Sequence, residues 1–412
     1  MMRLKYSMLL LLGFYSSSSF ALSTSLEIDI AAFNLVPDFK LLFLGGIFVI
    51  LMQAGFAVAE GGYEHNSKSI YSLIINYISA IIGIIFFSFI CSKLVFWGIG
   101  DTSNRLANSL QGWHWNLLFF YTLMATTITT VVGRVIPSSS SIVVHWLTGL
   151  MISAIIFPIF SSWVWGNLIF GGGWLKQAGF IDFAGSTVVH STAAWIVLAG
   201  YLTLKSKQKE EFIKKDLMFE DYKILSLALA GFVLWLAWSG LNVIYISAIR
   251  VDVSIIVMNS FAALFGAMIS PLIFSLFLNK RIMSWSELIK AALGGLVAIT
   301  ASCGFVNIYF ALFIGLISGI LTVYIPTLLT RWIDSKHVRE VLVVHGVCGI
   351  WGTWAVAFHQ NLAPELVGKT SFMAQGLGIL VNFIWSFTIA YIVFKTICKI
   401  DSWLKLKQQQ QI

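Results

Sequence analysis

Charged residues are scarce in this chain of 412 residues: they make up 11% of it, while hydrophobic residues make up 58%. Soluble domains carry about 25% charged residues, so the composition excludes a water-soluble globular protein. The mean hydropathy is +0.87, and the apolar residues are spread over the whole length rather than gathered in one anchor. The scarcity of charge therefore predicts a chain that crosses a lipid bilayer many times.

Cysteines and long polar segments are few as well. The four cysteines lie in or beside apolar runs and form no Cys-x-x-Cys pair; they are Cys91, Cys303, Cys348 and Cys398. This spacing supports neither a disulfide framework nor a zinc site, and we expect no metal and no cofactor. The largest polar stretch, 205–223, predicts a linker in mid-chain rather than a soluble domain.

Eleven apolar stretches are long enough to span a bilayer as helices. They cover 38–60, 70–99, 114–136, 142–165, 183–205, 224–247, 252–278, 285–302, 305–333, 342–359 and 369–398. The sequence thus predicts an all-α polytopic membrane protein whose membrane domain occupies 22–398. A short cytoplasmic tail, 399–412, would follow it.

The N-terminal segment 1–21 has the pattern of a secretory signal peptide. Arg3 and Lys5 precede an apolar core, and Ala21 ends a small-residue cleavage site. With Leu22 outside and alternating spans, 18 basic residues fall on the cytoplasmic side and six on the other, the remaining two of the 26 being in the signal. This asymmetry follows the positive-inside rule. It places the C-terminus in the cytoplasm and explains the net charge of +8 without a nucleic-acid partner.

An internal echo divides the spans into two five-helix halves, about 38–205 and 224–359, followed by a last helix at about 369–398. Val188-Val189-His190 lies in the last span of the first half, and Val343-Val344-His345 in the last span of the second. Because five is odd, the halves have opposite orientations. Inverted repeats of this kind place their working site at the repeat interface near the midplane. We therefore expect the two imidazoles to meet there.

A buried histidine pair allows more than one chemistry. Two histidines in contact can share and relay a proton, or they can ligate a haem iron or another metal. A histidine in a membrane helix can also simply bond a neighbouring helix. The remaining histidines lie towards span ends, which disfavours a haem carrier with stacked pairs; they are His65, His114, His145, His337 and His359.

At these residues the chain resembles the Amt/Rh/Mep ammonium transporter family, from about residue 38 to 398. The resemblance rests on five motifs: Met52–Ala57 with Glu60, Trp163–Gly166, Asp182–His190, Trp238–Asn242 and His345–Thr353. It implies eleven spans in two inverted halves, assembly as a homotrimer, and one pore in each subunit.

The resemblance also implies a site. His190 and His345 would be twin histidines in an apolar pore that ammonium crosses as neutral ammonia after losing a proton. Methylammonium would serve as an analogue of the substrate. Trp165, Tyr245 and Asp182 match the outer vestibule that recruits the cation, although an interfacial tryptophan and a helix-capping aspartate are plain alternatives. Two further residues match positions that support the pore: Trp238 and Asn242.

Several residues depart from the family pattern. Leu241 replaces one gate phenylalanine, and the second gate position falls at Leu123 or Met124. Tyr245 stands where a vestibule serine is usual. The long cytoplasmic tail through which members respond to a nitrogen-signalling protein is missing, so such a regulator is not expected. The replacements at the two gate positions predict a looser or differently wetted gate.

The sequence as a whole predicts a non-enzymatic ammonium/ammonia transporter of an inner or plasma membrane. A sensor that binds ammonium and conducts little of it is the main alternative, motivated by the altered gate and vestibule. A haem electron carrier is a third.

Overall fold

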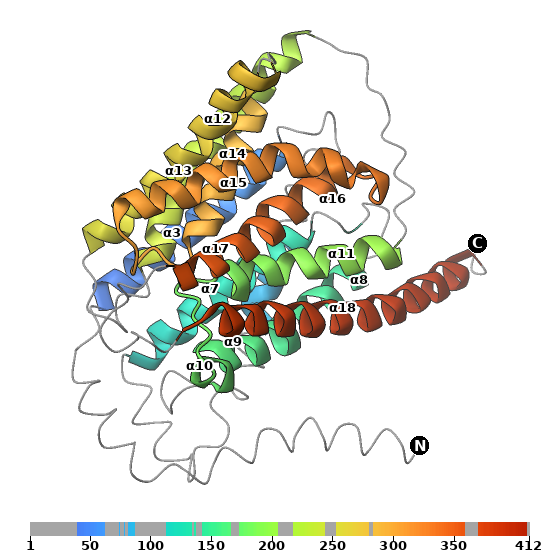
Figure 1. Cartoon of the computed structure of the whole chain (residues 1–412). Helices are drawn as coiled ribbons and strands as arrows, with labels where there is room; N and C mark the ends of the chain where they lie inside the picture. Colours follow the sequence, from blue (N-terminus) through green and yellow to red (C-terminus); the bar gives the residue numbers. More distant parts are fainter. Residues whose placement is uncertain are drawn as a thin grey trace, which may run out of the picture.

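The computed structural model describes residues 39–61, 74, 78, 81–86, 113–133, 136, 142–165, 173–204, 217–243, 253–279, 283–358 and 370–409. All regular elements within these ranges are helices (Figure 1). The expected signal peptide 1–21 and the vestibule candidate Tyr245 lie outside the described residues.

Helices coincide with the expected spans. The first half contains α3 (Phe39–Gly61), α7 (Trp113–Gly133), α8 (Ile142–Met151), α9 (Phe157–Trp165), α10 (Trp174–Gln177) and α11 (Thr192–Leu204). The second contains α12 (Leu217–Val243), α13 (Val253–Phe274), α14 (Trp285–Ile299), α15 (Ile308–Leu328), α16 (Lys336–Val341) and α17 (Cys348–Phe358), and α18 (Phe372–Gln409) is last. Of the expected span 70–99, helical residues 74, 78 and 81–86 are described.

Several of these helices join into longer spans through wide π-helical turns. η3 (Ile152–Ile156) joins α8 to α9, η4 (Ser186–Ser191) precedes α11, and η8 (Leu342–Val347) joins α16 to α17. Six described stretches are long and apolar enough to cross a membrane: Ile142–Trp165, Ser186–Leu204, Val253–Phe277, Ile308–Arg331, Lys336–Phe358 and Phe372–Lys399. Helices satisfy their own backbone polar groups, which lipid cannot do. The fold is therefore that of a multi-pass helical membrane protein.

Three boundaries differ by more than five residues from the sequence-based expectation. The sixth span begins at Leu217 rather than 224, inside the predicted linker 205–223. The tenth span begins at Lys336 rather than 342, because Ser335 accepts a hydrogen bond from the Val338 N–H and caps the helix there. The last helix continues to Gln409, through most of the predicted tail. Its polar C-terminal turns lack proline and glycine, so nothing in them ends the helix.

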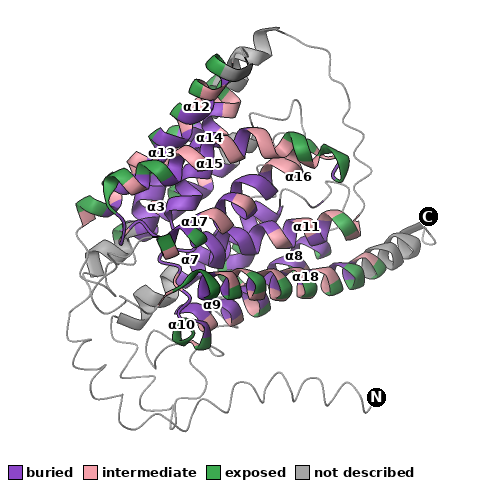
Figure 2. Ribbon diagram, in the orientation of Figure 1, coloured by how far each residue is buried: buried purple, intermediate pink, exposed green. Residues whose placement is uncertain are grey.

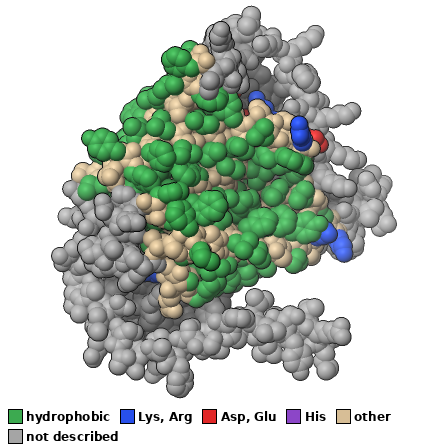
Figure 3. Space-filling view, viewed as in Figure 1, with side chains coloured by type: hydrophobic (Ala, Val, Ile, Leu, Met, Phe, Trp, Pro, Cys, Tyr) green, Lys and Arg blue, Asp and Glu red, His purple; other side chains and the backbone are tan. Residues whose placement is uncertain are grey.

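The helices pack around a buried centre. α12 lies against α3, α13 against both α14 and α15, and α11 against α18, while α7, α11 and α17 occupy the middle of the view in Figure 1. Burial is densest in these middle helices (Figure 2). The outer helices carry exposed apolar side chains, among them Phe232, Phe277 and Ile384, and hydrophobic side chains cover most of the face drawn in Figure 3. Such a surface suits contact with lipid.

Candidate functional site: a buried histidine pair

His190 and His345 lie in direct contact in the buried core. Their Nδ1 atoms are 3.2 Å apart, so one ring donates a hydrogen bond to the other. The ring centroids are 5.3 Å apart at an interplanar angle of 25°. His190 is fully buried and His345 is 5% exposed. The structure thus brings together the two histidines that the internal echo singled out.

Both histidines sit in π-helical turns. His190 belongs to η4 and His345 to η8, and each turn also contains the two valines before its histidine. π turns are rare in proteins and concentrate at functional sites. Neither turn contains a proline, so other contacts must account for the wide winding.

The carboxylate of Asp182 caps the start of η4. Its Oδ1 accepts hydrogen bonds from the N–H groups of Gly185 and Ser186, and its Oδ2 from those of Thr187 and Val188, at 2.8 to 3.0 Å. Gly185 has a φ of 108°, which only glycine adopts without strain. Burial raises the pKa of Asp182, which precedes the Ser186–Leu204 span, to about 6, while the four N–H donors favour its ionised form. Asp182 thus fixes the helix that carries His190.

Two hydroxyl groups satisfy carbonyls that the wide turn displaces. Ser191 donates to the Ser186 carbonyl and Thr192 to the Thr187 carbonyl, each five residues back, at 3.2 Å. Thr192 also accepts a hydrogen bond from the Asn382 Nδ2 of α18 at 2.7 Å. The residues after His190 therefore stabilise the π winding and tie it to the last helix.

Glycines let the helix of His345 approach its neighbours. A Cβ on Gly349 would lie 2.6 Å from the Ser186 carbonyl oxygen, and one on Gly352 would collide with the Ala298 carbonyl oxygen of α14. Thr353, the residue after Gly352, shares a hydrogen bond of 2.6 Å with Thr187 between their hydroxyls. The glycine spacing in the His345–Thr353 motif is thus explained by close packing.

Trp238, which α12 contributes, lies flat against His190. The two ring centroids are 4.9 Å apart at 17°, and the Trp238 Nε1 donates to the Thr300 Oγ1 at 2.9 Å. Asn242, one turn further along α12, donates to the Ser260 Oγ of α13 at 2.9 Å. The first residue contacts the histidine pair directly, and the second joins two helices beside it.

An aromatic cluster surrounds Trp165 at the end of α9. Its indole N–H donates to the Asp182 carbonyl at 2.8 Å, and it is 7% exposed. Tyr121 of α7 meets it edge to face at 6.0 Å, and Phe157 does so at 6.4 Å. Tyr121 was not among the residues predicted from the sequence, although it stands two residues before the gate candidate Leu123.

The three gate candidates are all buried: Leu123, Met124 and Leu241 are at most 2% exposed. The fourth altered position, Tyr245, lies outside the described residues. Phe56 of α3 lies 6.4 Å from the His345 ring, centroid to centroid. Apolar side chains are thus gathered in the same core as the histidines.

A third Val-Val-His string, Val143-Val144-His145, went unnoticed in the sequence. His145 is 3% exposed in α8, not merely near a span end, and neither of its ring nitrogens has a hydrogen-bond partner among the described residues. It lies in an ordinary α-helical stretch. The tripeptide alone is therefore not diagnostic. What distinguishes His190 and His345 from His145 is that each of the two follows its valines inside a π turn.

The pair does not have the geometry of a bis-histidine metal site. Imidazole nitrogens bind metals at about 2.0–2.1 Å, so two on opposite sides of one ion lie about 4 Å apart. The Nδ1 atoms are closer than that and bond each other directly. The contact favours proton sharing over haem ligation.

A family model described as Ammonium Transporter Family matches residues 40–412. The chain belongs to this family. Amt2 of Archaeoglobus fulgidus, an ammonium transporter, is 28% identical to it over 89% of this chain and 84% of its own. The ammonium transporter of Bacillus subtilis is 24% identical over 87% of this chain and 91% of its own. Members of the ammonium transporter family are transporters, not enzymes.

Solved structures agree with this membership. The structure described as Sensor Amt Protein superposes with a TM-score of 0.78 at 30% identity, over 89% of this chain and 94% of that one. Mep2 of Candida albicans superposes with a TM-score of 0.68 at 17% identity, over 87% and 83%, which shows a shared fold. The expected eleven-helix, multi-pass architecture is that of the ammonium transporter family.

Proposed function

We propose that this member of the family moves ammonium/ammonia across the membrane through a pore in which His190 and His345 handle the proton. The observation that carries the proposal is their Nδ1 contact of 3.2 Å inside an apolar core. His190 Nε2 has no hydrogen-bond partner among the described residues. One nitrogen of that ring thus serves the pair and the other is left for a passing molecule.

Recruitment would take place at Trp165, which contacts Asp182, and the family resemblance adds Tyr245, which lies outside the described residues. An indole face attracts a cation, and the hydrogen bond from Trp165 to the Asp182 carbonyl fixes the orientation of that face. Asp182 gives its carboxylate to the helix start rather than to a ligand. Its contribution to recruitment is therefore its charge and the position of Trp165.

Passage would follow loss of a proton. Moving an unsolvated cation through an apolar tube costs much free energy, whereas moving neutral ammonia does not. The buried gate candidates Leu123, Met124 and Leu241 would therefore exclude potassium, because they offer it no replacement for its water. The proton would move along the histidine pair or return outside. Trp238 holds one face of His190 and keeps that ring in line.

Alanine replacement of the histidines tests this proposal. His190→Ala and His345→Ala are each expected to abolish growth rescue on low ammonium in cells without other ammonium transporters. In liposomes, each should lose methylammonium uptake and any associated current. Membrane insertion and yield should persist, because the helices keep their other contacts.

His145→Ala is the matched control, since it removes a buried histidine after the same two residues but outside the pair. It is expected to keep uptake. Undiminished uptake in both pair variants would refute the role of the histidines, and equal loss in all three would assign the effect to general packing.

Little uptake by the wild-type protein in liposomes, combined with measurable ammonium binding, would instead support a sensor. One structural relative is described as a sensor. The curated relatives above are described as transporters, and the histidine pair is complete. Conduction is therefore the function that we propose first.

A further inference from the structure

We propose that the ion pair between Lys290 and Glu340 is a positioning device for His345. The inference rests on the proposed function, because it concerns the proton-handling pair. Neither residue touches the pore histidines, so both are positioning residues and act through the helices that carry them.

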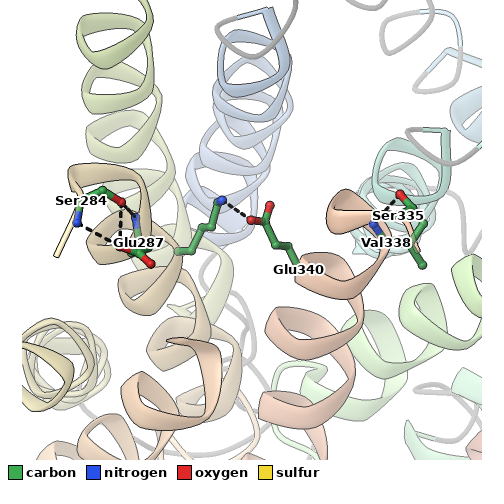
Figure 4. Close-up of polar contacts among 6 residues, drawn as sticks. Ser284, Glu287, Ser335, Val338 and Glu340 are labelled. Atoms are coloured by element: carbon green, nitrogen blue, oxygen red, sulfur yellow. Dashed lines mark hydrogen bonds and ion pairs between the residues drawn. The ribbon is translucent and has the colours of Figure 1, made fainter. Parts of the chain in front are cut away.

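The two charges meet between α14 and α16. Lys290 Nζ lies 2.6 Å from Glu340 Oε1, and the two side chains are 16% and 18% exposed. In Figure 4 Glu340 points from α16 towards the neighbouring helix, and a dashed line marks its ion pair with Lys290. A short contact between largely buried charges is directional, because water cannot replace either partner at low cost.

Glu340 stands two residues before the π turn of His345. It is the penultimate residue of α16, and η8 begins at Leu342. No side chain caps the start of η8. The turn itself packs against α11 and α14, and Glu340, before its start, adds a charged contact to another span.

α14 contacts the segments on both sides of the π turn η8: α16 before it and α17 after it. Gly352 of α17 packs against the Ala298 carbonyl of α14. Ser186, at the start of η4, donates to the Val297 carbonyl of α14 at 2.6 Å. Thr300, next to the end of α14, accepts the Trp238 indole N–H.

α14 thus contacts both of the segments that carry the histidines. Near its outer end it fixes the supports of His190, and at its inner end Lys290 fixes the start of the segment that carries His345. Removing the inner contact would let α16 and η8 shift relative to α14 while η4 stays in place. The Nδ1 contact between the histidines would then lengthen.

The test compares Lys290→Met and Glu340→Gln with the wild-type protein in liposomes, using methylammonium uptake. We expect the maximal rate to fall by up to about a hundredfold, the cost of a misplacement of about 1 Å in a reacting group. The KM should change less than twofold, because recruitment at Trp165 is untouched. The double reversal Lys290→Glu with Glu340→Lys should restore most of the rate.

Glu287→Gln is the matched control. Glu287 also lies on α14, but it serves the exposed capping box with Ser284 and not the contact to α16 (Figure 4). This variant should lose some thermal stability and keep the wild-type rate.

Wild-type rates in both single variants would overturn the positioning role, and so would equal losses in Glu287→Gln. If the single variants do not fold, the reversed pair decides: a restored rate supports the role and a low rate refutes it. The proposed function fails separately, since it requires loss of uptake in the histidine variants whatever happens at Lys290.

Discussion

Asp182 shows how much of the site depends on one side chain. Its two oxygens accept four backbone hydrogen bonds, whereas an asparagine can accept only with its carbonyl oxygen. Asp182→Asn would turn an amide NH₂ towards two buried N–H donors. We expect it to destabilise the protein by about 2–4 kcal/mol, the cost of leaving such groups unpaired. The melting temperature in detergent measures this.

Glu287→Gln supplies the comparison, because it weakens an exposed cap worth about 1 kcal/mol. A melting temperature for Asp182→Asn no lower than that of Glu287→Gln would argue against the capping role. Loss of uptake without loss of stability would instead assign Asp182 a direct contact with ammonium.

At the level of single residues, the sequence was enough to predict the histidine pair. It was not enough to exclude His145, which follows the same two valines. Val-Val-His occurs at 143–145, 188–190 and 343–345. The two in contact are followed by residues that support a wide turn or close packing: Ser191 and Thr192 in one case, Gly349 and Gly352 in the other. That distinction depends on which carbonyls the hydroxyls reach and which helices the glycines meet, and the spacing alone does not give it.

At the level of elements, the fit between α17 and α14 decides where His345 lies. Gly352→Ala would drive a Cβ into the Ala298 carbonyl. The backbones cannot yield without separating, so we expect a large loss of folded protein or of uptake. Folded yield by size-exclusion chromatography and methylammonium uptake measure it.

Gly376→Ala in α18 is the appropriate control, since among the described residues its Cβ would meet the Trp354 Nε1 at 3.7 Å, an ordinary contact, and nothing nearer. It also replaces glycine in a helix, which by itself favours stability. Equal behaviour of the two variants would contradict the close-packing explanation.

Spans were the most predictable elements, because apolar length sets them. Every expected span except 70–99, of which only a part is described, coincides with a helix over most of its length. Helix ends were less predictable. Span ten begins at the Ser335 cap, and span eleven runs on to Gln409, because local capping and helix propensity rather than hydropathy set these limits. The π turns could not be predicted from hydropathy, because they lie within uniformly apolar spans.

At the level of the whole molecule, charge distribution supports an orientation. Most Lys and Arg side chains visible in Figure 3 lie towards the margin where α16 and the C-terminal part of α18 lie. By the positive-inside rule this end would face the cytoplasm. The homotrimer and the inverted repeat stay predictions, although the matching π turns of His190 and His345 support the repeat.

Cysteine labelling checks the orientation. Tyr309, at the start of α15, is 82% exposed, and Lys336, at the start of α16, is exposed as well. Tyr309→Cys should react with a membrane-impermeant maleimide in intact cells, and Lys336→Cys only after permeabilisation. The parent protein, labelled under both conditions, is the blank that is subtracted, because Cys303 and Cys348 are buried but Cys398 is partly exposed. The reverse pattern would invert the topology.

The Nδ1 contact makes the two histidines chemically unequal. One ring must donate the shared hydrogen and the other accept it, so when both are neutral they are opposite tautomers. The Nε2 of the donor ring is then a bare acceptor, while the Nε2 of the acceptor ring carries a hydrogen. The histidine pair therefore has a polarity, and a single proton hop between the Nδ1 atoms, with matching changes at the Nε2 atoms, reverses it.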